Sequence, residues 1–105
     1  MKLQKSQQMY ITTLTHFLNE EGNIPKGMTK EARELASFLA LVVDQTTNEI
    51  SQDIVITDIR CFRKKCEGKI HSDYLKATDK IHWVCTNCKN EGIIDSWQNT
   101  QWDNR

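Results

Sequence analysis

The sequence lacks the features that mark membrane, secreted or strongly charged proteins. No apolar run approaches the 18 residues of a membrane helix. The start, MKLQKSQQMYITTLTHF, has no unbroken apolar stretch and no small-residue cleavage site. The formal net charge is zero, so the chain as a whole does not look like a nucleic-acid or membrane binder. We therefore expect a cytoplasmic protein that does not associate with membranes.

Motifs of catalysis are also missing. The sequence has no glycine-rich phosphate loop, no Ser/His/Asp arrangement and no pair of carboxylates beside a histidine. A redox role for the segment CTNC, residues 85–88, would require the strand–helix context of thioredoxin-like motifs, and the pattern here does not predict one. We expect that the protein is not an enzyme.

Hydrophobic residues make up only 38% of the chain, so the predicted core is small and requires an additional cross-link, such as a metal site, for stability. Four cysteines can supply it. Cys61 and Cys66 are separated by four residues, Cys85 and Cys88 by two, and the two pairs by eighteen. In a reducing compartment, paired cysteines favour a metal over disulfides. The spacing predicts one zinc ion per chain, bound by four thiolates and therefore structural, because no coordination position stays open.

Two histidines compete with the cysteines as ligands. His71 and His82 both fall in the middle of predicted strands, away from the two cysteine turns. We expect them to be exposed strand histidines rather than ligands.

Two helices are predicted in residues 1–50. Apolar residues at steps of three and four between Leu3 and Glu20 indicate the first. Thr29 is suited to cap the second, whose apolar face fades near residues 46–48. A Pro/Gly turn between them predicts a helical hairpin. Its surplus apolar surface would also allow a homodimer, with a seam formed by Leu14, Phe17, Leu18, Leu35, Leu39 and Val42.

The pattern changes to alternation and branched residues beyond residue 50. Segments 53–59, 67–75, 80–84 and 91–97 are typical of short strands. We therefore predict an α+β fold, with an N-terminal helical hairpin at residues 1–50 followed by a small antiparallel β zinc ribbon at residues 51–105. The two parts are expected to form one compact unit.

Residues 59–90, with CFRKKC and CTNC, resemble the zinc-ribbon superfamily. The second turn departs from the common ribbon pattern, because Thr86 and Lys89 stand where that pattern has Pro and Gly. Asn90 or Gly92 is expected to supply the unusual backbone geometry instead. Residues 81–103 also resemble the C-terminal end of small uncharacterised bacterial zinc-ribbon proteins. The resemblance implies a bacterial, cytosolic zinc ribbon, but no activity, since ribbons serve in transcription factors, polymerase subunits, ribosomal proteins and adaptors.

Basic side chains are concentrated around the cysteines. Residues 60–90 contain eight basic residues against three acidic ones. Some of this surplus is expected without any binding function, because a zinc ion with four thiolates carries a formal charge of −2. Two functions remain open: nucleic-acid binding or regulation, and a protein-interaction module or dimerising adaptor without nucleic-acid binding. The candidate phosphate contacts are Arg60, Arg63, Lys64, Lys65, Lys69, Lys80 and Lys89, with Lys76 as a further basic residue in the segment.

The three tryptophans all lie late in the chain. Trp83 is two residues before Cys85 and is expected in the core. Trp97 and Trp102 either fasten the polar tail to the rest of the protein or form an exposed surface for a partner, and we expect packing.

Overall fold

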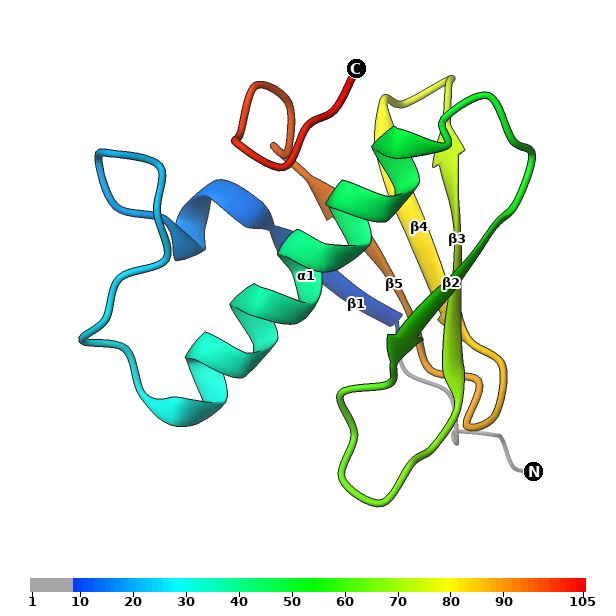
Figure 1. Ribbon diagram of the computed structural model, residues 1–105, viewed down its shortest axis with the longest axis horizontal. Coiled ribbons are helices and arrows are strands. Elements are labelled where there is room, and N and C mark those ends of the chain that lie inside the picture. Colours follow the sequence, from blue (N-terminus) through cyan, green and yellow to red (C-terminus); the bar gives the residue numbers. More distant parts are fainter. Residues whose placement is uncertain (1–8) are drawn as a thin grey trace.

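A computed structural model describes residues 9–105, which form a curved five-stranded sheet and one α-helix (Figure 1). The helix is α1 (Lys30–Asn48). A short 3-10 helix, η1 (Leu14–Phe17), follows the first strand. The strands are β1 (Met9–Thr13), β2 (Val55–Arg60), β3 (Lys69–Leu75), β4 (Lys80–Cys85) and β5 (Glu91–Asp95). Their spatial order is β1-β5-β4-β3-β2, and β1 is parallel to β5 while the other neighbouring pairs are antiparallel.

The predicted helical hairpin is wrong, and so is the purely antiparallel sheet. Residues 9–13 form β1, which joins the sheet beside β5 and makes it mixed. Branched side chains explain the difference, because Ile11, Thr12 and Thr13 favour a strand over a helix. The predicted start of the helix at Leu3 lies outside the described residues.

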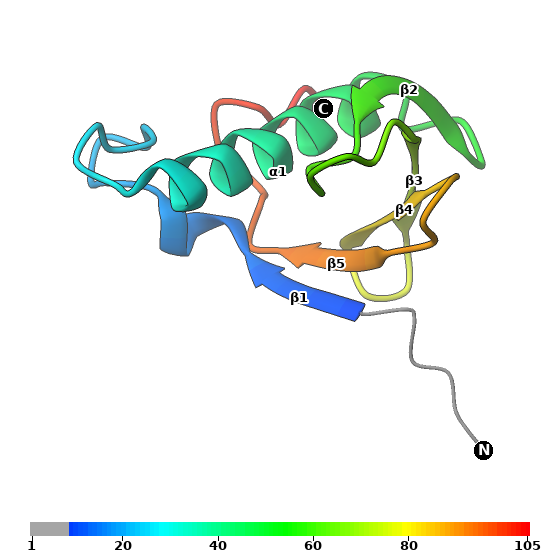
Figure 2. The ribbon, with the colours of Figure 1, turned by 90° about the horizontal axis from the view of Figure 1, so that it is seen from below.

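The second predicted helix and the four later strands are confirmed. Thr29 caps α1, since its Oγ1 accepts a hydrogen bond from the Ala32 amide at 3.2 Å. The helix lies across the concave side of the sheet, with β1 and β5 on one side of it and β2 curling up toward its other end (Figure 2).

No helix within residues 9–105 is both long enough and apolar enough to cross a membrane.

The core lies between α1 and the sheet. Trp83, Ile81, Ile70 and Ile94 from the strands are completely buried against helix residues such as Leu39. The prediction that Trp83 lies in the core is confirmed. Half of the predicted dimer seam belongs to this core: Leu14, Leu39 and Val42 are completely buried, and Phe17, Leu18 and Leu35 pack against it.

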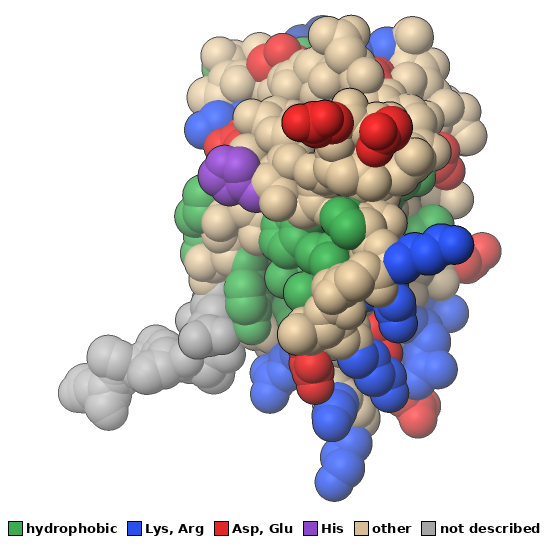
Figure 3. Space-filling view, turned by 90° about the vertical axis from the view of Figure 1, so that its left-hand side faces the viewer, with side chains coloured by type: hydrophobic (Ala, Val, Ile, Leu, Met, Phe, Trp, Pro, Cys, Tyr) green, Lys and Arg blue, Asp and Glu red, His purple; other side chains and the backbone are tan. Residues whose placement is uncertain are grey.

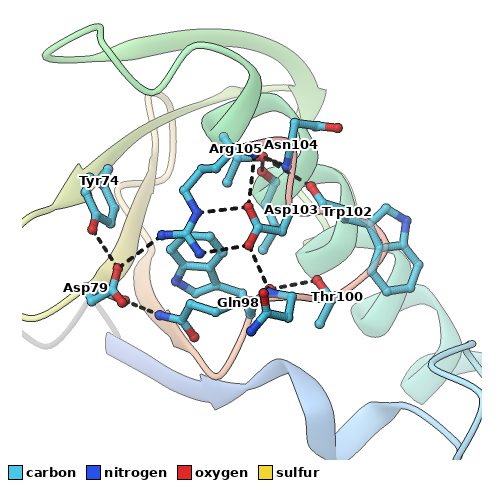
Figure 4. Close-up of polar contacts among 12 residues, drawn as sticks. Tyr74, Asp79, Gln98, Thr100, Trp102, Asp103, Asn104 and Arg105 are labelled. Carbon is cyan, nitrogen blue, oxygen red and sulfur yellow. Dashed lines mark hydrogen bonds and ion pairs between the residues drawn. The ribbon is translucent and has the colours of Figure 1, made fainter.

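The C-terminal tail is fastened to the rest of the protein. Trp97 is completely buried, and Trp102 is half-buried against the core, which confirms packing over an exposed aromatic surface. The guanidinium of Arg105 lies 4.5 Å from the centre of the Trp97 ring and pairs with Asp103 at 2.9 Å. Figure 4 shows Arg105 between Asp103 and Asp79, and Asp79 in turn accepts a hydrogen bond from the Tyr74 hydroxyl at 2.6 Å. The two ends of this network come from the β3–β4 hairpin and the tail.

Candidate metal centre

Four cysteine sulfurs converge at one end of the sheet. Cys61 directly follows β2, Cys66 lies in the loop that leads to β3, Cys85 ends β4, and Cys88 lies in the loop before β5. Both loops lie at the lower end of the molecule in Figure 1. We call them knuckle 1 (residues 61–66) and knuckle 2 (residues 85–88). All four Sγ atoms lie within 4.8 Å of one another, and none of the four cysteines forms a disulfide.

The sulfur positions fit one tetrahedral metal ion. The Sγ atoms of Cys61 and Cys88 are 3.8 Å apart, and those of Cys66 and Cys85 are 3.6 Å apart. A zinc ion with four sulfur ligands at about 2.3 Å requires sulfurs about 3.8 Å apart. The cluster could therefore coordinate a single metal ion with the four residues that the sequence spacing singled out.

Knuckle 2 directs two backbone amides at a cysteine sulfur. The amides of Asn87 and Cys88 point at Cys85 Sγ, at 3.4 and 3.5 Å, so the turn presents two hydrogen-bond donors to this sulfur. The turn closes at Lys89, whose φ of 69° is left-handed. The expectation that Asn90 or Gly92 supplies this geometry is wrong, because neither has a positive φ. The Lys89 side chain is exposed, and its Nζ donates back to the Thr86 carbonyl at 3.2 Å.

Knuckle 1 is longer and depends on a close approach at Gly68. Its turn closes with Lys65 at a φ of 68°, and the Cys66 amide donates to the Arg63 carbonyl at 3.2 Å. A Cβ atom at Gly68 would lie 2.5 Å from Cys85 Sγ and 2.6 Å from Asn87 Cβ. Only a residue without a side chain lets the two knuckles come this close.

The thiols differ in acidity before any metal binds. The backbone amide of Gly68 is the main reason that the pKa of Cys66 is lowered to about 6. Burial is the main reason that the pKa of Cys61 is raised to about 12. A metal ion that binds all four thiolates must therefore displace protons, which makes its affinity depend on pH.

Neither strand histidine belongs to the sulfur cluster. The sequence did not reveal where the His82 ring points. Its Nδ1 lies 2.9 Å from Asp73 Oδ1 and its Nε2 lies 2.7 Å from Glu91 Oε1, so it bridges three strands on the outer face of the sheet. Burial lowers the pKa of His82, but the hydrogen bonds to Glu91 and Asp73 outweigh it, and the net pKa is raised. His71 and His82 are both half-buried rather than exposed, and the two carboxylates beside His82 became recognisable only once the strand register was known.

The structure divides the predicted basic set between two ends of the molecule. Lys80 is opposite Leu75, at the far end of the β3–β4 hairpin from the Ile70–Cys85 pair, and Lys76 lies in the turn between them. Lysine and arginine side chains gather at the lower end of the molecule, below a hydrophobic area (Figure 3). We call the exposed basic residues on or next to the two knuckles the cationic end; they are Arg60, Arg63, Lys64, Lys65, Lys69 and Lys89.

The side chains of the cationic end have no acidic partner within residues 9–105. All ion pairs among residues 9–105 have His82 or Arg105 as the positive group, and neither residue belongs to the cationic end. In the described part of the chain, the one hydrogen bond made by a side chain of this set is from Lys89 Nζ to the Thr86 carbonyl, at 3.2 Å. Six positive charges are thus available to an outside ligand.

No protein-family model matches the chain, and comparisons with curated proteins and with solved structures find no significant similarity. The resemblance to zinc ribbons therefore depends on the cysteine pattern and on the four clustered sulfurs.

Proposed function

We propose that the chain is a small cytoplasmic nucleic-acid-binding protein, not an enzyme, in which one structural zinc ion holds the cationic end in shape. The observation that carries this proposal is the set of six exposed cations around the sulfur cluster, which have no acidic partner among the described residues. Glu67 and the formal −2 charge of a zinc tetrathiolate offset only part of their charge, so this end stays positive. Lysine and arginine side chains of this kind supply most protein contacts to phosphates.

Zinc is the metal that suits this donor set. Four thiolates in a tetrahedron are typical of structural zinc sites, and four free cysteines are expected in a reducing compartment. Cys61, Cys66, Cys85 and Cys88 would fill the coordination shell, which leaves no position for water or substrate and favours a structural role over catalysis. Elemental analysis of freshly purified, reduced protein should find one zinc ion per chain.

A salt titration tests the nucleic-acid proposal. Zinc-loaded protein is titrated into a fluorescein-labelled oligonucleotide, and the affinity is measured by anisotropy at increasing NaCl. Phosphate contacts predict that log K falls linearly with log[salt]. Affinity that is absent at low salt, or that does not change with salt, would reject the proposal.

Charge reversal at the two ends of the molecule gives a matched comparison. Arg63→Glu/Lys64→Glu alters knuckle 1, while Lys76→Glu/Lys80→Glu alters the opposite end by the same charge. The first variant should lose affinity about tenfold or more and show a shallower salt slope, while the second should bind nearly as tightly as the wild type. Zinc content and circular dichroism confirm that both variants are folded. Equal losses in the two variants would mean that the cationic end is not the binding surface.

A second candidate is a protein-interaction module, which the exposed apolar side chains favour. Ile56 is 76% exposed and Ile54 is 59% exposed on the edge strand β2 and the loop before it, and Leu41 is 50% exposed on α1. An edge strand of this kind can pair with another chain. Light scattering over a range of protein concentrations tests the homodimer version, which a monomer at every concentration would exclude.

A further inference from the structure

A groove runs between α1 and the segment that leads into knuckle 1. Its volume is about 800 Å³, within the range of clefts that bind small organic groups. Phe38 and Leu41 contribute one wall from the helix, while Ile59 and Phe62 contribute the other from the end of β2 and from knuckle 1. The groove and the candidate metal centre thus share a structural segment, because Phe62 lies between Cys61 and Arg63.

The aromatic part of the groove is held in place by its neighbours. The ring of Phe62 lies 5.0 Å from that of Phe38 and 5.8 Å from that of Trp83, both edge to face. The ring of Tyr10 lies 5.4 Å away on a further side. Phe62 nevertheless stays half-buried rather than buried, and it lines the groove. A fixed, partly open aromatic ring is the surface on which nucleobases stack, and every base has a face that can do so.

The rim of the groove carries the polar groups that a nucleotide requires. Arg33 from α1 and Arg60 from β2 flank it and can reach phosphates. The other polar side chains that line it have oxygen and amide groups that can pair with the edges of a base, and they are Glu34, Ser37, Gln45 and Asp58. Arg60 belongs to both the rim and the cationic end, so a phosphate chain can run from the groove onto knuckle 1.

We propose that this groove receives an unpaired base, and hence that the cationic end binds single-stranded nucleic acid in preference to duplexes. The inference rests on the proposed function above. Bases in a duplex are stacked and paired, so a groove in the protein can take one only from a strand whose bases are free to turn outward. The unpaired cations beside the groove supply the backbone contacts, and the groove supplies the contact that a duplex cannot make.

The test compares ligands that share phosphates but differ in available bases. Zinc-loaded full-length protein is titrated with a single-stranded DNA, an RNA of the same sequence, a duplex of the same length, and an abasic strand of the same length. Both single strands with bases should bind about tenfold or more tightly than the duplex and the abasic strand. A difference between the DNA and RNA arms would identify which sugar the site prefers.

The outcomes separate this inference from the proposed function. Equal binding of all four ligands with a steep salt dependence would overturn the groove assignment and leave phosphate binding intact. Failure of all four to bind would overturn both. An acidic peptide that binds as tightly as the single strand would likewise overturn the assignment, because a peptide offers no base.

A pair of matched variants tests whether the preference for single strands depends on the groove. Leu41→Glu puts a negative charge on a half-exposed groove residue, and Ile56→Glu makes the same change at an exposed position outside the groove. Leu41→Glu should bind the single strand about fivefold or more weakly than Ile56→Glu does. The two variants should bind the abasic strand with equal affinity. Phe62→Leu keeps the wall apolar and should also reduce the preference for the single strand over the abasic strand. A preference unchanged in Leu41→Glu and Phe62→Leu, each with native zinc content, would refute the groove as the base site.

Discussion

The Nε2 atom of His82 lies 2.7 Å from Oε1 of Glu91, across the boundary between β4 and β5. On the other side of the ring, Nδ1 lies 2.9 Å from Oδ1 of Asp73. Carboxylate oxygens accept hydrogen bonds, so both contacts are satisfied at once only when both ring nitrogens carry protons. The imidazolium thereby links three neighbouring strands on the outer face of the sheet.

This arrangement predicts that His82 stabilises the protein more at low pH. Burial opposes its positive charge, but the hydrogen bonds to Glu91 and Asp73 prevail, so the folded pKa lies above the ordinary value of 6.5. The stabilisation is then fully present below about pH 6.5 and is lost as the pH rises through the folded pKa. The difference in unfolding free energy between wild type and His82→Gln, measured with urea, should shrink from about pH 5.5 to about pH 8.5. Cysteine protonation affects both proteins alike, and a difference that grows with pH would contradict the prediction.

Replacing a cysteine should remove the metal and unfold the chain. Cys85 is completely buried, and its Sγ accepts hydrogen bonds from two backbone amides. Cys85→Ser therefore removes a metal ligand at the most enclosed position of the cluster. Structural zinc can contribute roughly 10–16 kcal/mol, which is comparable to the whole stability of a typical domain, about 5–15 kcal/mol. Metal content and circular dichroism are the measurements, and Thr86→Ser, at the exposed neighbouring position, is the control. A Cys85→Ser protein that retained full zinc and native stability would show that the cluster is not the metal site.

Gly92 should tolerate no side chain. It lies opposite Trp83, and a Cβ atom there would be 2.6 Å from the indole Nε1. Because Trp83 is completely buried, the ring cannot move aside without disturbing the core. Gly92→Ala should cost about 1–3 kcal/mol in urea unfolding. Gly27→Ala, where a Cβ atom would meet nothing within 4 Å, should change stability little, and equal effects at the two positions would argue against this packing.

Thr47 should prove necessary for the docking of the tail. Its Oγ1 accepts from the amide of Asn104 at 2.9 Å, and its single proton is shared between the carbonyls of Val43, at 2.8 Å, and Trp102, at 3.1 Å. Thr47→Val keeps the shape but removes the contact of Oγ1 with the Asn104 amide and the Trp102 carbonyl, at a cost of about 1–3 kcal/mol. Hydrogen exchange of the Asn104 amide should accelerate in this variant. Thr78→Val, in an exposed turn, should leave that exchange rate unchanged, and an unchanged rate in both variants would mean that Thr47 does not hold the tail.

Local pattern predicted α1 and the four later strands, but the predicted fold, a helical hairpin followed by an antiparallel ribbon, was wrong. The cap at Thr29 and the apolar face that follows it identified α1, and alternation identified β2 to β5. The strand β1 was missed for a physical reason. The apolar spacing of this segment favoured a helix while its branched side chains favoured a strand, and the hydrogen bonding to β5, far away in the sequence, decides between them.

The same distinction applies to the candidate site. The spacing of Cys61, Cys66, Cys85 and Cys88 predicted the sulfur cluster, because each pair lies in one short turn. The bridge made by His82 and the groove beside Phe62 depend on strand register and on where α1 lies across the sheet. Neither relationship is encoded within a single element, so neither could be predicted from the sequence.

The parallel pairing of β1 with β5 also has a consequence for synthesis. Met9 is opposite Glu91, so the ribosome makes one strand 82 residues before its partner. Until β5 emerges, the backbone of β1 has no neighbour, and Met9 and Ile11, both at least half exposed even in the finished fold, belong to an unprotected apolar segment. Closing so long a loop is slow, and the sheet is completed only after β5 has been made. A nascent chain halted before residue 91 would therefore present this segment to chaperones and proteases.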